Sequence, residues 1–179
     1  MRDLWWNLSR ATGIVATVLA VGALVWGLFF SARNTGQLRR PNWWLDLHNW
    51  LGGLALIFTG AHLLTVYLND NSGIGLVQLF IPGTAGTGQW GITWGVIAAY
   101  TFAVAVFTSW PRKRLSRRAW RAVHLSSVGG VFLAGIHAFE SGSDATTTVF
   151  EAGLLAATAF FAYAVSVRVL ALIARRRAR

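Results

Sequence analysis

Long apolar stretches, separated by short polar segments, run through the whole chain. Four of them contain no Asp, Glu, Lys or Arg, and a fifth has only Glu151 at its start and Arg168 near its end. A helix needs about 20 mostly apolar residues to cross the hydrocarbon core of a bilayer. The pattern predicts an all-α integral membrane bundle, a single domain over residues 1–179, with helices spanning about residues 11–32, 45–68, 90–110, 121–140 and 149–173.

The overall composition agrees with a membrane protein. Hydrophobic residues make up 55% of the chain and charged residues 12%, which is more apolar than soluble domains of this length usually are. We therefore expect membrane lipid to be the main surroundings of the five helices.

Basic residues outnumber acidic ones by 16 to 6, and their positions indicate a topology signal. Thirteen of the 16 lie in the segments 33–40, 112–121 and 175–179, whereas the connections 69–89 and 140–148 contain none. Loops rich in Lys and Arg stay on the cytoplasmic side of a membrane. We expect the C-terminus in the cytoplasm, the N-terminus outside, and no nucleic-acid partner.

All four histidines lie within predicted spans, two in the second and two in the fourth. Both spans run from the cytoplasm outward, so His48 and His124 lie near the inner face, and His62 and His137 near the outer face. Ionisable side chains are costly at membrane depth and usually have a partner there. Imidazole is a common axial ligand of haem iron. The pattern predicts two stacked haems, the inner one held by His48 and His124 and the outer one by His62 and His137.

The histidine separations fit two sites at different depths. Separations of 14 and 13 residues correspond to about 21 Å and about 19.5 Å along a helix. However, 13 residues leave His124 and His137 about 140° out of line on an ideal helix. We expect a kink or bulge near Ser126–Ser127 or Gly129–Gly130 to correct part of this.

Three glycines near the histidines, Gly52, Gly60 and Gly135, favour close approach of a large flat cofactor, although ordinary helix packing also explains each of them. The chain has no cysteine, which excludes disulfides, thiolate metal sites and covalently attached c-type haem. Two readings without haem stay open: a proton or metal-ion path through the histidines, and histidines that only hold neighbouring helices together.

These residues resemble the ferric-reductase-like transmembrane domain family, which also forms the membrane core of the NADPH oxidases and ferric reductases. The resemblance rests on the two histidine spacings and on three short motifs: LSRATG at Leu8–Gly13, RRAWRAVH at Arg117–His124 and GSD at Gly142–Asp144. The motifs are similar to those of short bacterial members, which implies a bacterial cytoplasmic membrane. The family further implies two haems b on the paired histidines, with propionates contacted by Arg10, Arg33 and Arg121.

The function that the resemblance implies is that of a membrane cytochrome carrying electrons between a partner donor and an extracytoplasmic acceptor. We expect no dinucleotide-binding fingerprint, so the reducing power would come from a redox partner such as a flavoprotein, an extracytoplasmic reductase or quinone. The alternative is a self-contained oxidoreductase that uses quinone, superoxide or ferric iron at an exposed haem edge.

Overall fold

The computed structural model describes residues 2–32, 43–86, 89–109 and 115–177. Every regular element in these residues is helical. In chain order they are α1 (Arg2–Ala32), α2 (Trp43–Tyr67), the short 3₁₀ helix η1 (Asp70–Ser72), α3 (Leu76–Phe80), α4 (Trp90–Ser109), α5 (Arg117–Ser141) and α6 (Thr148–Arg177).

Among the described residues, five helices are long and apolar enough to cross a membrane, which confirms the predicted number of spans. The apolar parts are Leu4–Ser31, Trp43–Tyr67, Trp90–Ser109, Arg117–Ser141 and Thr148–Ala174. The protein is therefore a multi-pass helical membrane protein.

Two helices begin earlier than the apolar pattern predicts. The helix α1 starts at Arg2 and continues through Arg10, whose charge is matched by a carboxylate from another part of the chain. The helix α5 starts at Arg117 because Ser116 caps it: the Ser116 hydroxyl accepts a hydrogen bond from the Ala119 amide at 3.2 Å. Charged and capping residues thus extend both helices beyond their apolar stretches.

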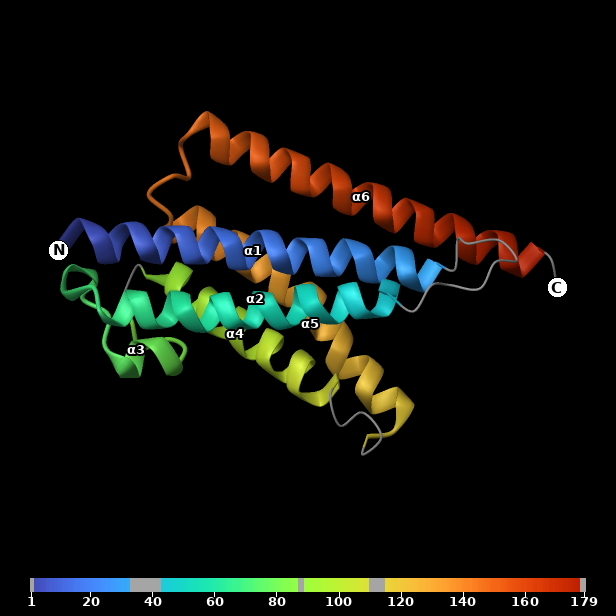
Figure 1. Cartoon of the computed structure of the whole chain (residues 1–179), viewed down its shortest axis with the longest axis horizontal. Helices are drawn as coiled ribbons and strands as arrows, with labels where there is room; N and C mark the ends of the chain where they lie inside the picture. The colour runs from blue at the N-terminus through green and yellow to red at the C-terminus, as the bar shows by residue number, and fades with distance from the viewer. Residues whose placement is uncertain (1, 33–42, 87–88, 110–114, 178–179) are drawn as a thin grey trace.

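The helices form two antiparallel pairs, α1 with α2 and α4 with α5, and α6 lies along α1 (Figure 1). Weaker contacts join α2 to α4 and α1 to α5, so these four helices close into a ring. By contrast, the described backbones of α2 and α5 hardly approach each other. The N-terminus, α3 and the α5–α6 connection lie at one end of the bundle, and the C-terminus at the other (Figure 1).

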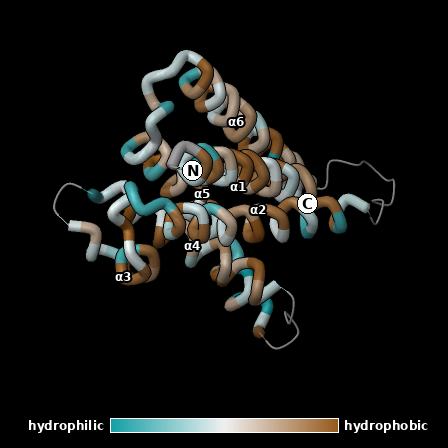
Figure 2. The backbone as a smooth tube through the Cα atoms, turned by 60° about the vertical axis from the view of Figure 1, so that its left-hand side comes forward, coloured by the Kyte–Doolittle hydropathy of each residue, from teal (hydrophilic) through white to brown (hydrophobic). Residues whose placement is uncertain are grey.

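Small residues fill the interior of the bundle. The most buried hydrophobic side chains are mainly alanines, with Ala16, Ala20 and Ala23 along one side of α1 and Ala98 and Ala105 on α4. Small side chains allow close helix packing in lipid, where apolar burial gives little driving force. Large side chains point outward instead, as expected for lipid-facing surfaces, and brown hydrophobic positions run along the helices in Figure 2.

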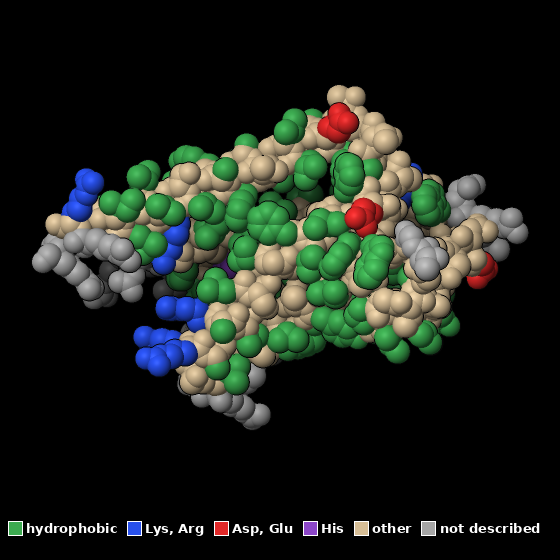
Figure 3. All heavy atoms as spheres, turned by 180° about the vertical axis from the view of Figure 1, so that it is seen from behind, with side chains coloured by type: hydrophobic (Ala, Val, Ile, Leu, Met, Phe, Trp, Pro, Cys, Tyr) green, Lys and Arg blue, Asp and Glu red, His purple; other side chains and the backbone are tan. Residues whose placement is uncertain are grey.

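Charge is distributed unevenly between the two ends. On the face drawn in Figure 3, most arginine side chains gather toward one end of the molecule and the visible Asp and Glu side chains lie toward the other. Asp46, in the first turn of α2, lies at the basic end. Within α6, Nη1 of Arg168 donates a hydrogen bond to the Ser31 carbonyl oxygen at 2.9 Å, near the end of α1, where helix carbonyls lack partners and a positive charge is favourable.

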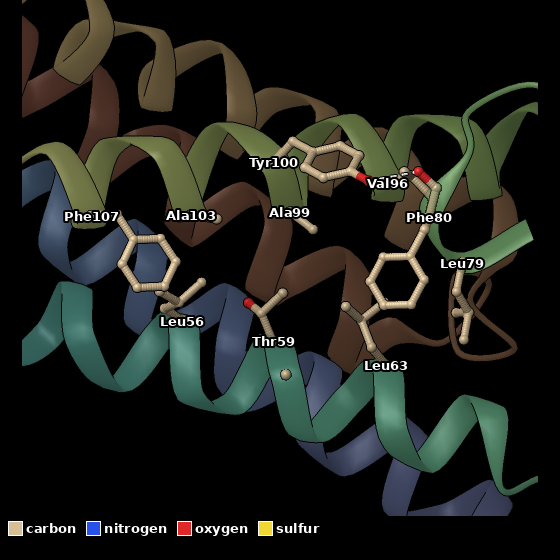
Figure 4. A pocket seen from close by; sticks show the side chains of 11 residues that line it. Leu56, Thr59, Leu63, Leu79, Phe80, Val96, Ala99, Tyr100, Ala103 and Phe107 are labelled. Atoms are coloured by element: carbon tan, nitrogen blue, oxygen red, sulfur yellow. Dashed lines mark hydrogen bonds between the residues drawn. The ribbon is translucent and has the colours of Figure 1, made fainter. Parts of the chain in front are cut away.

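The connection between α2 and α4 folds back against the bundle. The Tyr100 hydroxyl donates to the Phe80 carbonyl oxygen at 2.7 Å, which ties α3 to α4. Below this bond lies an apolar groove of about 260 Å³ between α2, α3 and α4, whose lining includes Leu63, Phe80 and Phe107 (Figure 4). No histidine lines this groove.

Candidate functional site

The structure brings the four histidines together as two pairs at different depths. The ring centroids of His48 and His124 are 5.7 Å apart, and those of His62 and His137 are 6.0 Å apart. Each pair joins α2 to α5, the two helices whose backbones stay apart. The pairs match the depth arrangement expected from the sequence.

Three of the histidines are oriented by backbone carbonyl groups of a neighbouring helix. On α2, Nδ1 of His48 lies 3.0 Å from the Ala23 oxygen, and Nδ1 of His62 lies 2.8 Å from the Ser9 oxygen. On α5, Nδ1 of His137 lies 2.8 Å from the Gly91 oxygen. A carbonyl oxygen can only accept, so Nδ1 carries the proton in each ring.

A glycine four residues after each accepting carbonyl makes these bonds possible. The Ser9, Ala23 and Gly91 carbonyls precede Gly13, Gly27 and Gly95, respectively. A β-carbon at these glycines would lie 3.0 Å from the His62 ring, 3.1 Å from the His48 ring and 2.8 Å from the His137 ring. Any larger residue would therefore push the imidazole away from its acceptor.

The fourth histidine is oriented by a side chain instead. The Ser109 hydroxyl donates to the Ala105 carbonyl oxygen at 2.7 Å, so its oxygen accepts from Nδ1 of His124 at 3.3 Å. Trp120 donates from Nε1 to the same oxygen at 3.4 Å. Its ring also stacks on the His124 ring, with a centroid distance of 5.0 Å and an interplanar angle of 18°.

These bonds leave the Nε2 lone pair of each imidazole available. Within the described part of the chain, no hydrogen bond uses Nε2 of His48, His62, His124 or His137. Metal-binding histidines typically donate their other ring N–H to an oxygen in this way. Two imidazoles on one metal ion, each bonded at about 2 Å, place their ring centroids about 6 Å apart. The observed separations are close to this value.

Open space surrounds the glycines that the sequence singled out. A β-carbon at Gly52, Gly60 or Gly135 would meet no atom within 4 Å. Gly52 lies one turn after His48 on the same helix face. Gly60 lines the apolar groove between α2, α3 and α4, which no histidine lines. At Gly52, the open space and the separated backbones of α2 and α5 leave room beside His48 for a flat group.

The helix α5 contains no bulge between its two histidines, so this part of the sequence-based expectation is wrong: Arg117–Ser141 is a continuous α-helix. The Ser126 and Ser127 hydroxyls each donate at 2.7 Å to carbonyls of the preceding turn, Val123 and His124. Such bonds slightly bend a helix.

The three arginines expected near the site differ in their surroundings. Arg10 binds Asp144 through two hydrogen bonds, one from Nε to Oδ2 at 2.9 Å and one from Nη2 to Oδ1. This ion pair joins LSRATG to GSD and adjoins Ser9, the residue that orients His62. Arg121 lies exposed on α5, one turn before His124. Arg33 lies outside the described residues.

We predict that the Arg10–Asp144 pair stabilises the end of the bundle at which α1 begins. Replacing Asp144 with asparagine removes the charge of a two-bond ion pair that is only partly exposed, and we expect a loss of about 1 kcal/mol of unfolding free energy. A double-mutant cycle with Arg10→Gln, measured by thermal unfolding in detergent, isolates the coupling. Glu151→Gln is a charge-matched control, and equal effects of D144N and E151Q would contradict a specific pair.

Sequence reasoning missed the groups that orient the imidazoles. Carbonyl acceptors leave no side-chain signal, and Ser109 gave none before its partners were seen. The glycines did leave one: Gly13 and Gly27 are 14 residues apart, the same separation as His48 and His62 on the antiparallel partner helix. Matching the two spacings would have predicted the contacts.

Two further observations limit the chemistry of the site. The described residues contain no group of three or more His, Cys, Asp or Glu side chains that could hold a metal ion. The glycine spacing G-x-G-x-x-G does occur once, at residues 86–91. Its last two residues begin the membrane helix α4, and it follows no strand in the described residues, so it lacks the context of a dinucleotide fingerprint.

Comparison with known proteins identifies one family. A family model described as the ferric reductase like transmembrane component matches residues 6–135. The matched segment includes His48, His62 and His124 and stops just before His137. Neither the curated proteins nor the solved structures contain a match to this chain.

Proposed function

This chain belongs to the ferric reductase-like transmembrane family, and from that premise we propose that it is a b-type cytochrome whose two haems carry electrons across the membrane. The family gives a membrane redox role. The number of haems, the residues that hold them and the direction of electron flow are our proposal.

The observation that carries the proposal is the orientation of the four imidazoles. Each Nδ1 is bonded to an oxygen of the neighbouring helix, and each Nε2 is left without a partner among the described residues. A histidine that merely held two helices together would need only the first bond. The paired, partner-free Nε2 atoms fit haem iron better than a structural role.

The chain's own residues set the positions of the two sites. His48 and His124 would hold the inner haem, and His62 and His137 the outer one. Separations of 14 and 13 residues place these pairs about 20 Å apart along the helices, a distance that covers most of a hydrocarbon core of about 30 Å. When bound, a bis-histidine haem supplies one-electron transfer between ferric and ferrous iron. Gly13, Gly27 and Gly95 keep three of the imidazoles in place.

We propose that the basic end of the bundle faces the cytoplasm. Arg117, Arg118 and Arg121 are exposed at this end, near the His48–His124 pair, and the connections at the other end carry no basic residue. Electrons would enter from a partner such as a flavoprotein or quinol and leave toward an extracytoplasmic acceptor.

This orientation predicts the result of cysteine labelling. The chain has no native cysteine, so a single one introduced at Ser72 should react with an impermeant maleimide added outside intact cells. One introduced at Ser116 should react only after the cells are opened. The reverse pattern would invert the proposed electron path.

Electron transfer itself can be tested in liposomes that contain the purified chain and an impermeant acceptor inside. Added dithionite should reduce the acceptor through the wild-type protein, whereas NADPH alone should not. The variants His137→Ala and His48→Ala should each slow the reduction to the rate of protein-free liposomes. Full-rate reduction in a variant that has demonstrably lost one haem would contradict a relay through both sites.

A further inference from the structure

We infer that Ser109, held by Trp120, is a positioning residue that fixes the tautomer and ligand strength of His124, and that it makes the inner site differ from the outer one. The inference rests on the proposed function for its haem readouts. The geometry behind it concerns only residues of this chain.

Position 109 departs from the glycine pattern found beside the other three histidines. The imidazoles of His48, His62 and His137 each bond to a helix carbonyl oxygen. A glycine four residues after that carbonyl has no side chain to block the ring. By the same rule, His124 would reach the Ala105 carbonyl, and position 109 would be glycine. Ser109 occupies this position instead, 14 residues after Gly95, just as Gly27 follows Gly13 by 14 residues.

The Ser109 hydroxyl lies between the His124 imidazole and the Ala105 carbonyl. It donates to the Ala105 oxygen at 2.7 Å and accepts from Nδ1 of His124 at 3.3 Å, so it links the two groups. The Ala105 carbonyl is also close enough to act on the His124 ring directly.

Trp120 contacts both Ser109 and His124. Its Nε1 donates to the Ser109 oxygen at 3.4 Å, while its ring stacks nearly parallel on His124 with a centroid distance of 5.0 Å. The indole therefore holds both the acceptor and the imidazole. None of the other three histidines has a stacked aromatic neighbour among the described residues.

An oxygen that accepts from Nδ1–H makes the imidazole a stronger donor to metal through Nε2, and this favours ferric over ferrous iron. Removing the Ser109 hydroxyl in Ser109→Ala should raise the midpoint potential of the inner haem and weaken its binding about 10-fold. The outer haem should not change. Ser109→Thr keeps the hydroxyl, and Ser109→Gly uncovers the Ala105 carbonyl, so both should restore near wild-type behaviour.

The test combines redox titration and haem dissociation of these three variants with Ser126→Ala as a control, because Ser126 bonds only within α5. Trp120→Phe, which keeps a ring but loses the N–H, should shift the inner potential in the same direction as Ser109→Ala. The inference is overturned if Ser109→Ala leaves the inner haem unchanged, if it shifts both haems equally, or if Ser109→Gly behaves like Ser109→Ala.

A second measurement separates this inference from the proposed function. In haem-free protein, ¹⁵N chemical shifts should show His124 as the Nδ1–H tautomer in the wild type and Ser109→Thr, and as a tautomer mixture in Ser109→Ala. That result in a chain that binds no haem would support the positioning role while refuting the proposed function. If Ser109→Ala instead bound two haems and had the same ¹⁵N shifts and midpoint potentials as the wild type, the proposed function would stand and the positioning role of Ser109 would be refuted.

Discussion

Replacing His137 with alanine is expected to remove the outer haem and leave the inner one in place. The same result is expected for His62→Ala, because both imidazoles face the same site with ring centroids 6.0 Å apart. His48→Ala and His124→Ala should instead remove the inner haem. Each variant should therefore hold half of the wild-type haem, a change that haem extraction and protein quantification can measure.

The prediction also specifies which histidine variants should behave alike. The redox titration of His62→Ala should match that of His137→Ala, and both should differ from that of His48→Ala. Each variant thus serves as the control for general misfolding in the others. If His62→Ala and His124→Ala emptied the same site, the pairing by depth would be wrong.

The second large effect is expected at Gly95, a glycine that packs against the His137 ring. A β-carbon at Gly95 would lie 2.8 Å from Nδ1 of His137, so Gly95→Leu should displace the ring from the Gly91 carbonyl. Loss of such an orienting bond typically weakens metal binding about 10- to 100-fold, and overpacking in the interior costs about 1–3 kcal/mol. We expect the outer haem to dissociate while the inner one is retained.

Gly153→Leu on α6 is the matched control, because a β-carbon there would meet no atom within 4 Å. Dissociation of the outer haem is followed by its transfer to an excess of a soluble haem acceptor. Equal retention in G95L and G153L would show that the carbonyl contact does not hold His137.

The fold was predictable from the sequence to the extent that membrane constraints determine it. The apolar stretches predicted five spans, and the described residues contain five helices that are long and apolar enough to cross a membrane. The ends of the helices were harder to predict, because they depend on partners that are distant in the sequence. Arg10 was expected to lie near a helix end, but Asp144 compensates its charge and the helix extends to Arg2. Local composition cannot show such a pairing.

The pairing of the four imidazoles was predictable from the sequence, but the groups that orient them were not. Charge and depth indicated which imidazoles face each other, because ionisable groups are rare within a membrane. Their orientation depends on backbone carbonyls of Ser9, Ala23 and Gly91, which any residue type could provide. Only the glycines that uncover them carry sequence information. Ser109 departs from that glycine pattern, and its role became visible only with its three hydrogen-bond partners in place.

The most direct test of the central claim is the haem content of the purified chain, measured by reduced-minus-oxidised spectra together with a redox titration. The account predicts two b-type haems per chain, both low-spin with bis-histidine ligation, titrating as two one-electron steps. A chain that folds and stays monodisperse in detergent, is expressed with sufficient haem supply, and yet contains no haem or only one would contradict it.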